Sequence, residues 1–143
     1  MTSVFVDTAG WMACADAADP LHASAIAARD ERLEAGDVLV TTDFVLDETL
    51  TLLRLRLGLD ATERWWDQVD GSPRLKWERI DVDRIDKARA LFFRYRDKTF
   101  SFTDCTSFVV MRELKIVRAL TTDAHFRQMG FQVLPSPRRS RGR

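Results

Sequence analysis

The strongest constraint on the fold is a short apolar stretch near the start of the chain that ends in an acid. Residues 4–6 are all apolar, Asp7 follows them, and Thr8 opens a segment with helical character. An unbroken apolar run of this length is typical of a strand buried on both faces of a parallel sheet. Ligands bind beyond the carboxyl ends of such strands, so Asp7 lies where a site is expected. Asp is also a favoured helix N-cap residue, which leaves a purely structural explanation open.

The rest of the chain alternates between extended and helical patterns. Further strands are predicted at residues 37–41, 75–80, 116–120 and 131–134, and helices at 8–18, 21–35, 44–57, 61–69, 81–97, 102–115 and 124–129. Strands that alternate with helices indicate an α/β protein with a parallel sheet and right-handed crossovers. The chain has 143 residues, which suits a single domain. We expect that domain at residues 1–135, with a flexible basic tail at 136–143.

Composition narrows the possible functions. The 22 basic residues balance the 22 acidic ones, which argues against bulk electrostatic binding of nucleic acid but not against an enzyme that touches a few phosphates. The four arginines of the tail favour a solvated chain end, with a phosphate-contacting arm as the alternative. Two distant cysteines without a CxxC motif indicate a reducing cytoplasm and argue against a zinc site. Without a signal-peptide pattern or a spanning apolar run, we expect a cytoplasmic protein that does not contact membranes.

Three further acids fall on the same side of the predicted sheet. Asp123 follows the strand at 116–120 as Asp7 follows the first strand. Asp104 lies in the first turn of the helix at 102–115, where it also fits a capping box with Ser101. Glu48 lies in the middle of a helix, on the shoulder of an apolar stripe, and has no capping role. Capping alone therefore accounts for three of the four acids but not for the whole set.

Convergence of the four acids favours a metal site. Clustered carboxylates without counter-charges repel and raise one another's pKa values, and none of the four short motifs contains Lys or Arg. A hard divalent cation would neutralise them, and oxygen ligands favour Mg²⁺ or Mn²⁺ over zinc or copper. Such a site can activate water for attack on a phosphodiester.

Four motifs carry a family resemblance in their order along the chain. They are FVDTAGW at 5–11, VLDETLTLL at 45–53, FSFTDCTSF at 100–108 and ALTTDAHF at 119–126. With these motifs the chain resembles the PIN-domain family, specifically VapC-like toxins of type II toxin–antitoxin systems. The resemblance implies a PIN-like three-layer sandwich, with a five-stranded parallel sheet of order 3-2-1-4-5 and helices on both faces. It also implies a homodimeric endoribonuclease that uses Mg²⁺, for which Mn²⁺ can substitute, and that a cognate antitoxin inhibits.

The resemblance also implies roles for particular residues. The catalytic and metal-binding acids are Asp7, Glu48, Asp104 and Asp123, and the polar residues expected to position the RNA substrate are Thr8, Thr103, Ser107 and Thr122. The expected reaction is hydrolysis of an RNA phosphodiester that leaves a 5′-phosphate and a 3′-hydroxyl. His125 is interpreted as a surface or hydrogen-bonded histidine. The leucine- and tryptophan-rich segment at 50–66 is the expected docking surface for the antitoxin.

Two other functions remain alternatives. A receiver-like phosphoacceptor signalling domain is also a small α/β fold with acids at strand ends. It would need a lysine after a late strand, where this chain has Thr121 and Thr122, and it has no use for Glu48. The second alternative is a non-catalytic α/β binding module whose acids are only helix caps and solvated charges.

Overall fold

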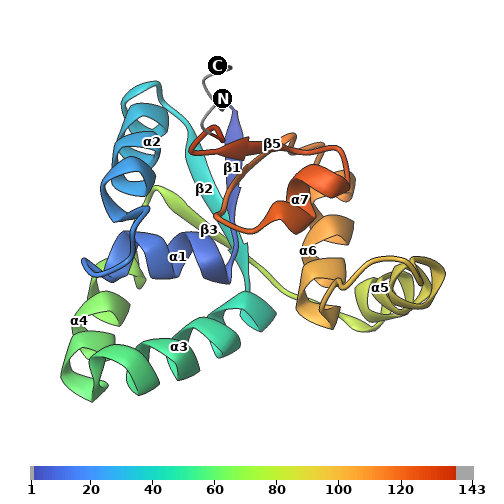
Figure 1. Cartoon of the computed structure of the whole chain (residues 1–143), viewed down its shortest axis with the longest axis horizontal. Coiled ribbons are helices and arrows are strands. Elements are labelled where there is room, and N and C mark those ends of the chain that lie inside the picture. The colour runs from blue at the N-terminus through green and yellow to red at the C-terminus, as the bar shows by residue number, and fades with distance from the viewer. Residues whose placement is uncertain (1, 138–143) are drawn as a thin grey trace, which may run out of the picture.

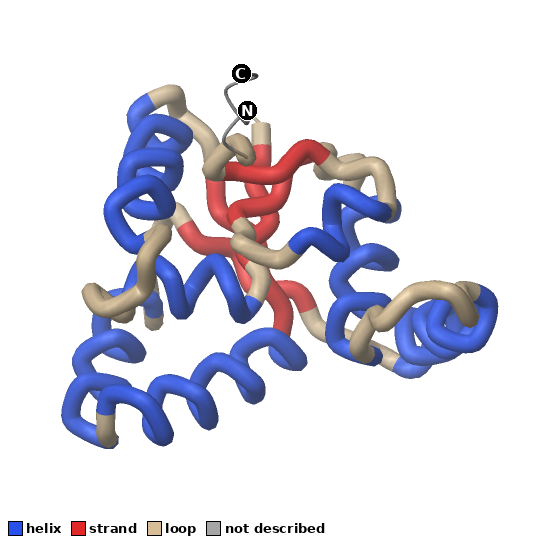
Figure 2. Tube along the Cα trace, in the orientation of Figure 1, coloured by secondary structure: helices blue, strands red, loops and turns tan. Residues whose placement is uncertain are grey.

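A computed structural model describes residues 2–137, and five strands in that range form one parallel sheet (Figures 1 and 2). The strands are β1 (Ser3–Val6), β2 (Val38–Thr42), β3 (Leu75–Glu78), β4 (Arg118–Leu120) and β5 (Gln132–Leu134). Their order is β3-β2-β1-β4-β5, and every neighbouring pair is parallel. The predicted sheet and strand order are therefore confirmed, with β1 at the centre.

Helices cover both faces of the sheet and complete the predicted three-layer sandwich. They are α1 (Thr8–Ala15), α2 (His22–Glu34), α3 (Asp43–Leu57), α4 (Leu59–Val69), α5 (Val82–Arg94), α6 (Phe102–Glu113) and α7 (Ala124–Gln128). In Figure 1, α1 to α4 lie on one side of the sheet and α5 to α7 on the other. Within residues 2–137, no helix combines the length and apolarity needed to cross a bilayer. The expected tail falls mainly at 138–143, outside the described residues.

Four helix boundaries differ by two residues or more from those expected. Helix α5 ends at Arg94 rather than at residue 97, and α6 ends at Glu113 rather than at residue 115. The other two lie at α1 and α4. The first helix ends at Ala15 rather than near residue 18, because Asp16 is extended and its carboxylate accepts a hydrogen bond from the Ala18 N–H at 2.9 Å. The fourth helix begins at Leu59 rather than at residue 61. Gly58, with φ of 89°, separates it from α3, and helix formation resumes immediately after this residue. None of these differences moves an acid of the candidate site.

Aromatic packing on the α6–α7 face fixes the helices that carry two of the acids. The ring of Phe108 on α6 packs edge-to-face against Phe126 on α7, with centroids 5.0 Å apart. Phe126 also stacks on Phe5 of β1 at 6.2 Å, and all three rings are fully buried. Aromatic pairs in this range add about 0.5–1.5 kcal/mol beyond the burial of their area. The cluster holds α6 and α7 in fixed positions against the central strand.

Gly10 brings the first turn of α1 directly against the end of β4. A Cβ atom at this position would lie 2.0 Å from the carbonyl oxygen of Leu120, which is shorter than any van der Waals contact. Glycine is thus required by the close approach of two backbones. The approach places the start of α1 beside the residues that follow β4.

Replacing Gly10 by Ala should destabilise the protein by more than about 3 kcal/mol, because overpacking here meets rigid backbone and not a movable side chain. Gly36→Ala is the matched control. Gly36 has φ of 93° and open space around it, so its replacement should cost only about 1 kcal/mol of backbone strain. Urea unfolding curves measure both losses, and equal losses would contradict the close approach.

Candidate active site

Asp7 is buried at the junction of α1 and β4. One carboxylate oxygen accepts a hydrogen bond from the Gly10 N–H at 2.8 Å, so Asp7 is the N-cap of α1. The other oxygen accepts a hydrogen bond from the Thr121 hydroxyl at 2.7 Å. The residue is only 5% exposed. Both oxygens are therefore fixed by groups that belong to different segments of the chain.

Burial raises the pKa of Asp7 from 3.8 to about 7, because the charged carboxylate loses its hydration. The hydrogen bonds from Gly10 and Thr121 act in the opposite direction, while the nearby carboxylates of Asp104 and Asp123 raise the pKa further. The three aspartates are thus close enough to repel one another. A cation placed among them would reverse this balance and favour the charged forms.

His125 joins the other two aspartates. Its Nδ1 atom lies 2.8 Å from Asp104 Oδ2 and 3.3 Å from Asp123 Oδ2. Asp104 also accepts a hydrogen bond from the backbone N–H of Ser101 at 3.0 Å, completing the capping box of α6. Asp123 is the N-cap of α7 and accepts from the backbone N–H of His125 at 2.9 Å. The predicted capping interactions form, and the same carboxylates also converge on one imidazole.

These three side chains have the geometry of a cation site. One ligand atom from each of Asp104, Asp123 and His125 lies within 4.8 Å of the other two, and no other such group occurs among the described residues. Carboxylate oxygens suit Mg²⁺ and Mn²⁺, while an imidazole nitrogen is more typical of transition metals. The donor set therefore fits a divalent cation, with Asp7 close by as a further carboxylate.

Thr121 connects the two acids at the strand ends. Its hydroxyl donates to Asp7 and accepts from the backbone N–H of Asp123 at 3.0 Å. Thr121 is buried, so this link is shielded from water. The sequence analysis did not select Thr121 and did not place His125 among the acids. The only local signals were a Thr two residues before a capping Asp and a His two residues after it.

Glu48 lies apart from the aspartates. It is exposed on α3 and lines a groove together with Asp47, Thr51 and Thr103. Thr103 directly precedes Asp104, so this groove borders the cluster formed by the aspartates and His125. Among the described residues, no hydrogen bond joins Glu48 to the aspartates. The structure therefore brings three of the four predicted acids together and places the fourth in an adjacent groove.

The four predicted substrate-positioning residues differ in accessibility. Thr122 is exposed and Thr103 half-buried. Thr8 is buried, and its hydroxyl has no hydrogen-bond partner in the described structure. Ser107 is buried and donates to the Thr103 carbonyl at 3.1 Å. Only Thr103 and Thr122 present surface that a substrate can reach without rearrangement.

The fold and the site define the class: an α/β protein with a parallel sheet and a cluster of aspartates beyond its carboxyl edge. Comparison with known proteins identifies the family. The PIN domain model matches residues 4–132, so the chain belongs to the PIN-domain family. Within that family it resembles VapC toxins. It is 35% identical over 130 residues to the 23S rRNA-specific endonuclease VapC20 of Mycobacterium tuberculosis (strains CDC 1551 / Oshkosh and ATCC 25618 / H37Rv), covering 90% of this chain and 95% of the relative.

A second relative and a solved structure agree with this assignment. Ribonuclease VapC26 of Mycobacterium tuberculosis (strain ATCC 25618 / H37Rv) is 28% identical over 126 residues, covering 86% of this chain and 89% of its own. The crystal structure of Mycobacterium tuberculosis VapC20, described as a sarcin–ricin loop cleaving toxin, superposes with a TM-score of 0.78. That match has 34% identity and covers 90% of this chain and 95% of the solved one. Membership of this family argues against the receiver-like alternative.

The buried Asp7 carboxyl should make the stability of the metal-free protein depend on pH. Its folded pKa of about 7 exceeds the ordinary value of 3.8, so its contribution is fully present below about pH 4 and is lost as the pH rises through 7. Asp7→Asn should reduce the fall in unfolding free energy between pH 5 and 7 by up to about 1.4 kcal/mol per pH unit.

Urea unfolding in EDTA at pH 5, 6, 7 and 8 measures this difference. Asp47→Asn is the control, because Asp47 is exposed on α3 and its replacement should leave the pH dependence unchanged. If the free energy of unfolding depended on pH in the same way for the parent protein and for Asp7→Asn, burial would not raise the pKa of Asp7.

Proposed function

We propose that this protein is a metal-dependent endoribonuclease, the toxin of a toxin–antitoxin pair, that hydrolyses RNA phosphodiesters to leave a 5′-phosphate and a 3′-hydroxyl. The observation that carries the proposal is the convergence of Asp7, Asp104 and Asp123 from three segments of the chain, with no Lys or Arg among their hydrogen-bond partners within residues 2–137. Similarity to VapC20 and VapC26, whose names describe RNA cleavage, supports the same reaction.

The cation would be Mg²⁺, with Mn²⁺ able to substitute. Asp104, Asp123 and His125 would hold it directly, with Asp7 and Glu48 as the further acids of the site. A bound cation would supply Lewis-acid activation of water and neutralise charge at the scissile phosphate. The carboxylates serve as ligands and proton acceptors and not as nucleophiles.

The protein's own groups then have separate tasks. Thr121 fixes the orientation of Asp7, and in the metal-free protein the Nδ1 atom of His125 bridges Asp104 and Asp123. Because the pKa of Asp7 is about 7, the metal-free site carries a proton there for part of the time at neutral pH, and cation binding should release it. The accessible hydroxyls of Thr103 and Thr122 are available to phosphate oxygens, and Ser107 holds the Thr103 carbonyl from the next turn of α6. The buried Thr8 would reach the substrate only after a rearrangement.

The substrate we propose is a structured ribosomal RNA. VapC20 is named as specific for 23S rRNA, and its crystal structure is described as that of a sarcin–ricin loop cleaving toxin. Identity of 35% over 90% of the chain supports a stem–loop of this kind as the first RNA to test. A toxin with this target acts where ribosomes are, so we also propose a cytoplasmic location.

Purified protein should cleave a hairpin RNA with the sarcin–ricin loop sequence when Mg²⁺ or Mn²⁺ is present, and this cleavage should stop when EDTA is added. Asp104→Asn should lower the rate at least about a hundredfold, since even outer-shell partners of metal ligands cost 10–100-fold. It should also shrink the gain in melting temperature that Mn²⁺ gives the parent, because a lost ligand weakens binding to the folded state.

Asp86→Asn is the control for this test. Asp86 lies on α5 and forms an exposed ion pair with Arg89, so its replacement should preserve both cleavage and the Mn²⁺ gain. Cleavage that is equal with and without chelator would refute metal dependence. An Asp104→Asn protein that gains as much from Mn²⁺ as the parent would show that this residue is only a helix cap.

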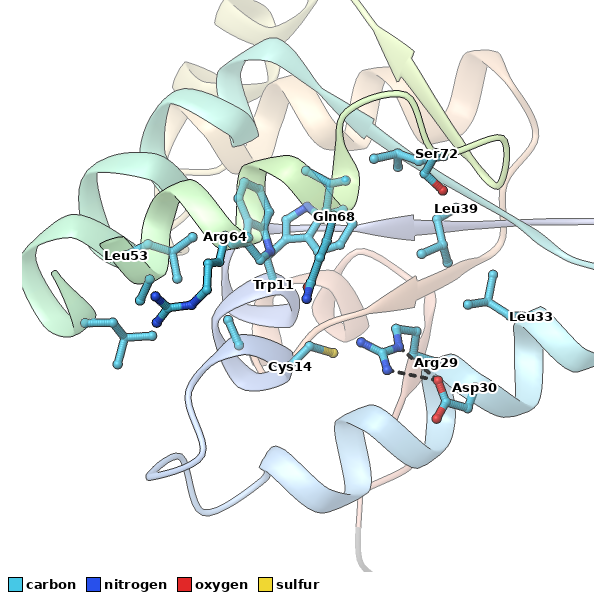
Figure 3. Close-up of a pocket in the computed structure, with 16 residues that line it drawn as sticks. Trp11, Cys14, Arg29, Asp30, Leu33, Leu39, Leu53, Arg64, Gln68 and Ser72 are labelled. Carbon is cyan, nitrogen blue, oxygen red and sulfur yellow. Dashed lines mark hydrogen bonds and ion pairs between the residues drawn. The ribbon is translucent and has the colours of Figure 1, made fainter. Parts of the chain in front are cut away.

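A cavity of about 430 Å³, which none of the three aspartates of the site lines, is the candidate surface for the antitoxin (Figure 3). Its walls come from α1, α2, α3, α4 and the strands β2 and β3, and include Leu33, Leu53 and the edge-on pair Trp11 and Trp65. Arg64 and Gln68 line it from α4 and are exposed. We propose that an apolar segment of the antitoxin docks here, at the part of the 50–66 segment that faces α1.

Trp65 is buried against Trp11, so its truncation would unfold the protein and would not test docking. Leu57→Glu is a better test of docking than truncation of Trp65, because Leu57 lines the cavity and is 37% exposed. It should weaken the complex with the product of the adjacent small open reading frame at least about tenfold, since a charge replaces apolar contact. Leu55→Glu is the matched control, because Leu55 is on the same helix, 76% exposed and outside the cavity lining.

Titration of the two variants with the partner measures this difference, and equal affinities would contradict the docking surface.

Light scattering of the toxin alone, in the same series, measures its oligomeric state. We propose a homodimer, supported by the exposed apolar side chains of Val82 and Phe93 on α5. A monomeric mass at all concentrations would contradict it.

A further inference from the structure

Two grooves of opposite electrostatic character flank the aspartates. The first, which we name the α2–β5 groove, is a hollow of about 660 Å³ between the start of α2, the segment 121–127 that follows β4, and residues 133–137 at the end of β5. It includes Asp123 of the candidate site, the neighbouring Thr122, and Arg127 of α7. The groove therefore begins at the site itself.

The α2–β5 groove continues along α2 into a second hollow. The two hollows share Ser24, Pro135 and Ser136, and the extension adds Arg118, which begins β4. Apart from Asp123, the ionisable residues that line the two hollows are Arg127, Arg118, Arg32 and Glu31. Arg32 is paired with Asp37 at 3.5 Å, so its charge is already balanced. Arg127 and Arg118 against Glu31 still leave the path net basic once Asp123 is neutralised by a cation.

The groove beside α3 has the opposite character. Asp47 and Glu48 line it, and no Lys or Arg is among its described lining residues. Even with Glu48 counted among the acids of the cation site, a phosphate placed there would meet the carboxylate of Asp47 without a counter-charge from that lining. Because RNA carries one negative charge per nucleotide, the difference in charge between the two grooves selects the path of the strand.

We propose that the RNA strand leaves the cleavage site along the α2–β5 groove and that Arg127 binds the phosphate next to the scissile one. Arg127 is exposed, and no ion pair engages it within residues 2–137, so its guanidinium is available to a phosphate. The hydroxyls of Thr122 and Ser136 provide further donors for backbone oxygens, and contacts of this kind set the register of a strand. The proposal rests on the proposed function, since it assigns the substrate path of the same site.

Steady-state cleavage of the sarcin–ricin hairpin in Mn²⁺ tests the path. Arg127→Glu should raise KM about tenfold and leave kcat within about twofold of the parent. It should also reduce the slope of log affinity against log salt by about 1, the loss of one phosphate contact. Arg127→Lys should retain most of the affinity, and Arg118→Gln should raise KM about threefold without touching the aspartates.

Two matched variants serve as controls. Arg56→Glu changes an exposed arginine on α3, outside both grooves, and should leave KM unchanged. Asp47→Asn should also leave KM unchanged, whereas it would lower KM if the strand followed the α3 groove. The gain in melting temperature with Mn²⁺ should be the same in every variant and the parent.

An Arg127→Glu protein with the parent's KM and salt dependence would overturn the proposal, and so would a lowered KM for Asp47→Asn. If Arg127→Glu lost both the rise in melting temperature with Mn²⁺ and most of kcat, the proposal would also be overturned, since Arg127 would then act on the metal site. If the parent protein cleaves no RNA, the proposed nuclease fails. The affinity for the same hairpin, measured by fluorescence anisotropy in Ca²⁺, still tests the groove independently.

Discussion

The buried hydrogen bond from Thr121 to Asp7 is the contact on which the candidate site depends. It joins the residue after β1 to the residue after β4, and the same hydroxyl accepts a hydrogen bond from the backbone N–H of Asp123. Gly10 makes this possible, because only a residue without a side chain lets α1 approach the carbonyl of Leu120 so closely. Two adjacent parallel strands thereby present their terminal acids within one small volume.

Each aspartate of the site caps a helix, which stabilises the fold, and also adds a carboxylate to a cluster of like charges, which opposes folding. Asp7, Asp104 and Asp123 accept backbone N–H groups at the starts of α1, α6 and α7. Burial and the neighbouring carboxylates of Asp104 and Asp123 raise the pKa of Asp7, against the lowering effect of its own hydrogen bonds. The Nδ1 atom of His125 lies close to both Asp104 and Asp123. Such a conflict between helix capping and clustered charge is expected at a functional site.

The site and the candidate partner cavity lie on different parts of the molecule. The cavity is enclosed by α1 to α4 and the β2–β3 side of the sheet, and none of the three aspartates lines it. The aspartates lie at the carboxyl edge, where α1, α6 and α7 begin. Helix α1 is the element that the two places share, because it lines the cavity with Trp11 and is capped by Asp7.

The sequence by itself determined the alternation of strands and helices, the parallel sheet and the position of an aspartate after β1 and β4, because these follow from local patterns of apolar residues and caps. It predicted that Asp7, Glu48, Asp104 and Asp123 converge beyond the carboxyl edge that parallel strands share, and the three aspartates lie together there. Only the tertiary structure decided that Thr121 binds Asp7, 114 residues away, and that His125 bridges Asp104 and Asp123. It also decided that Glu48 is exposed in its own groove, because the direction of a side chain on a helix is set by what packs against that helix.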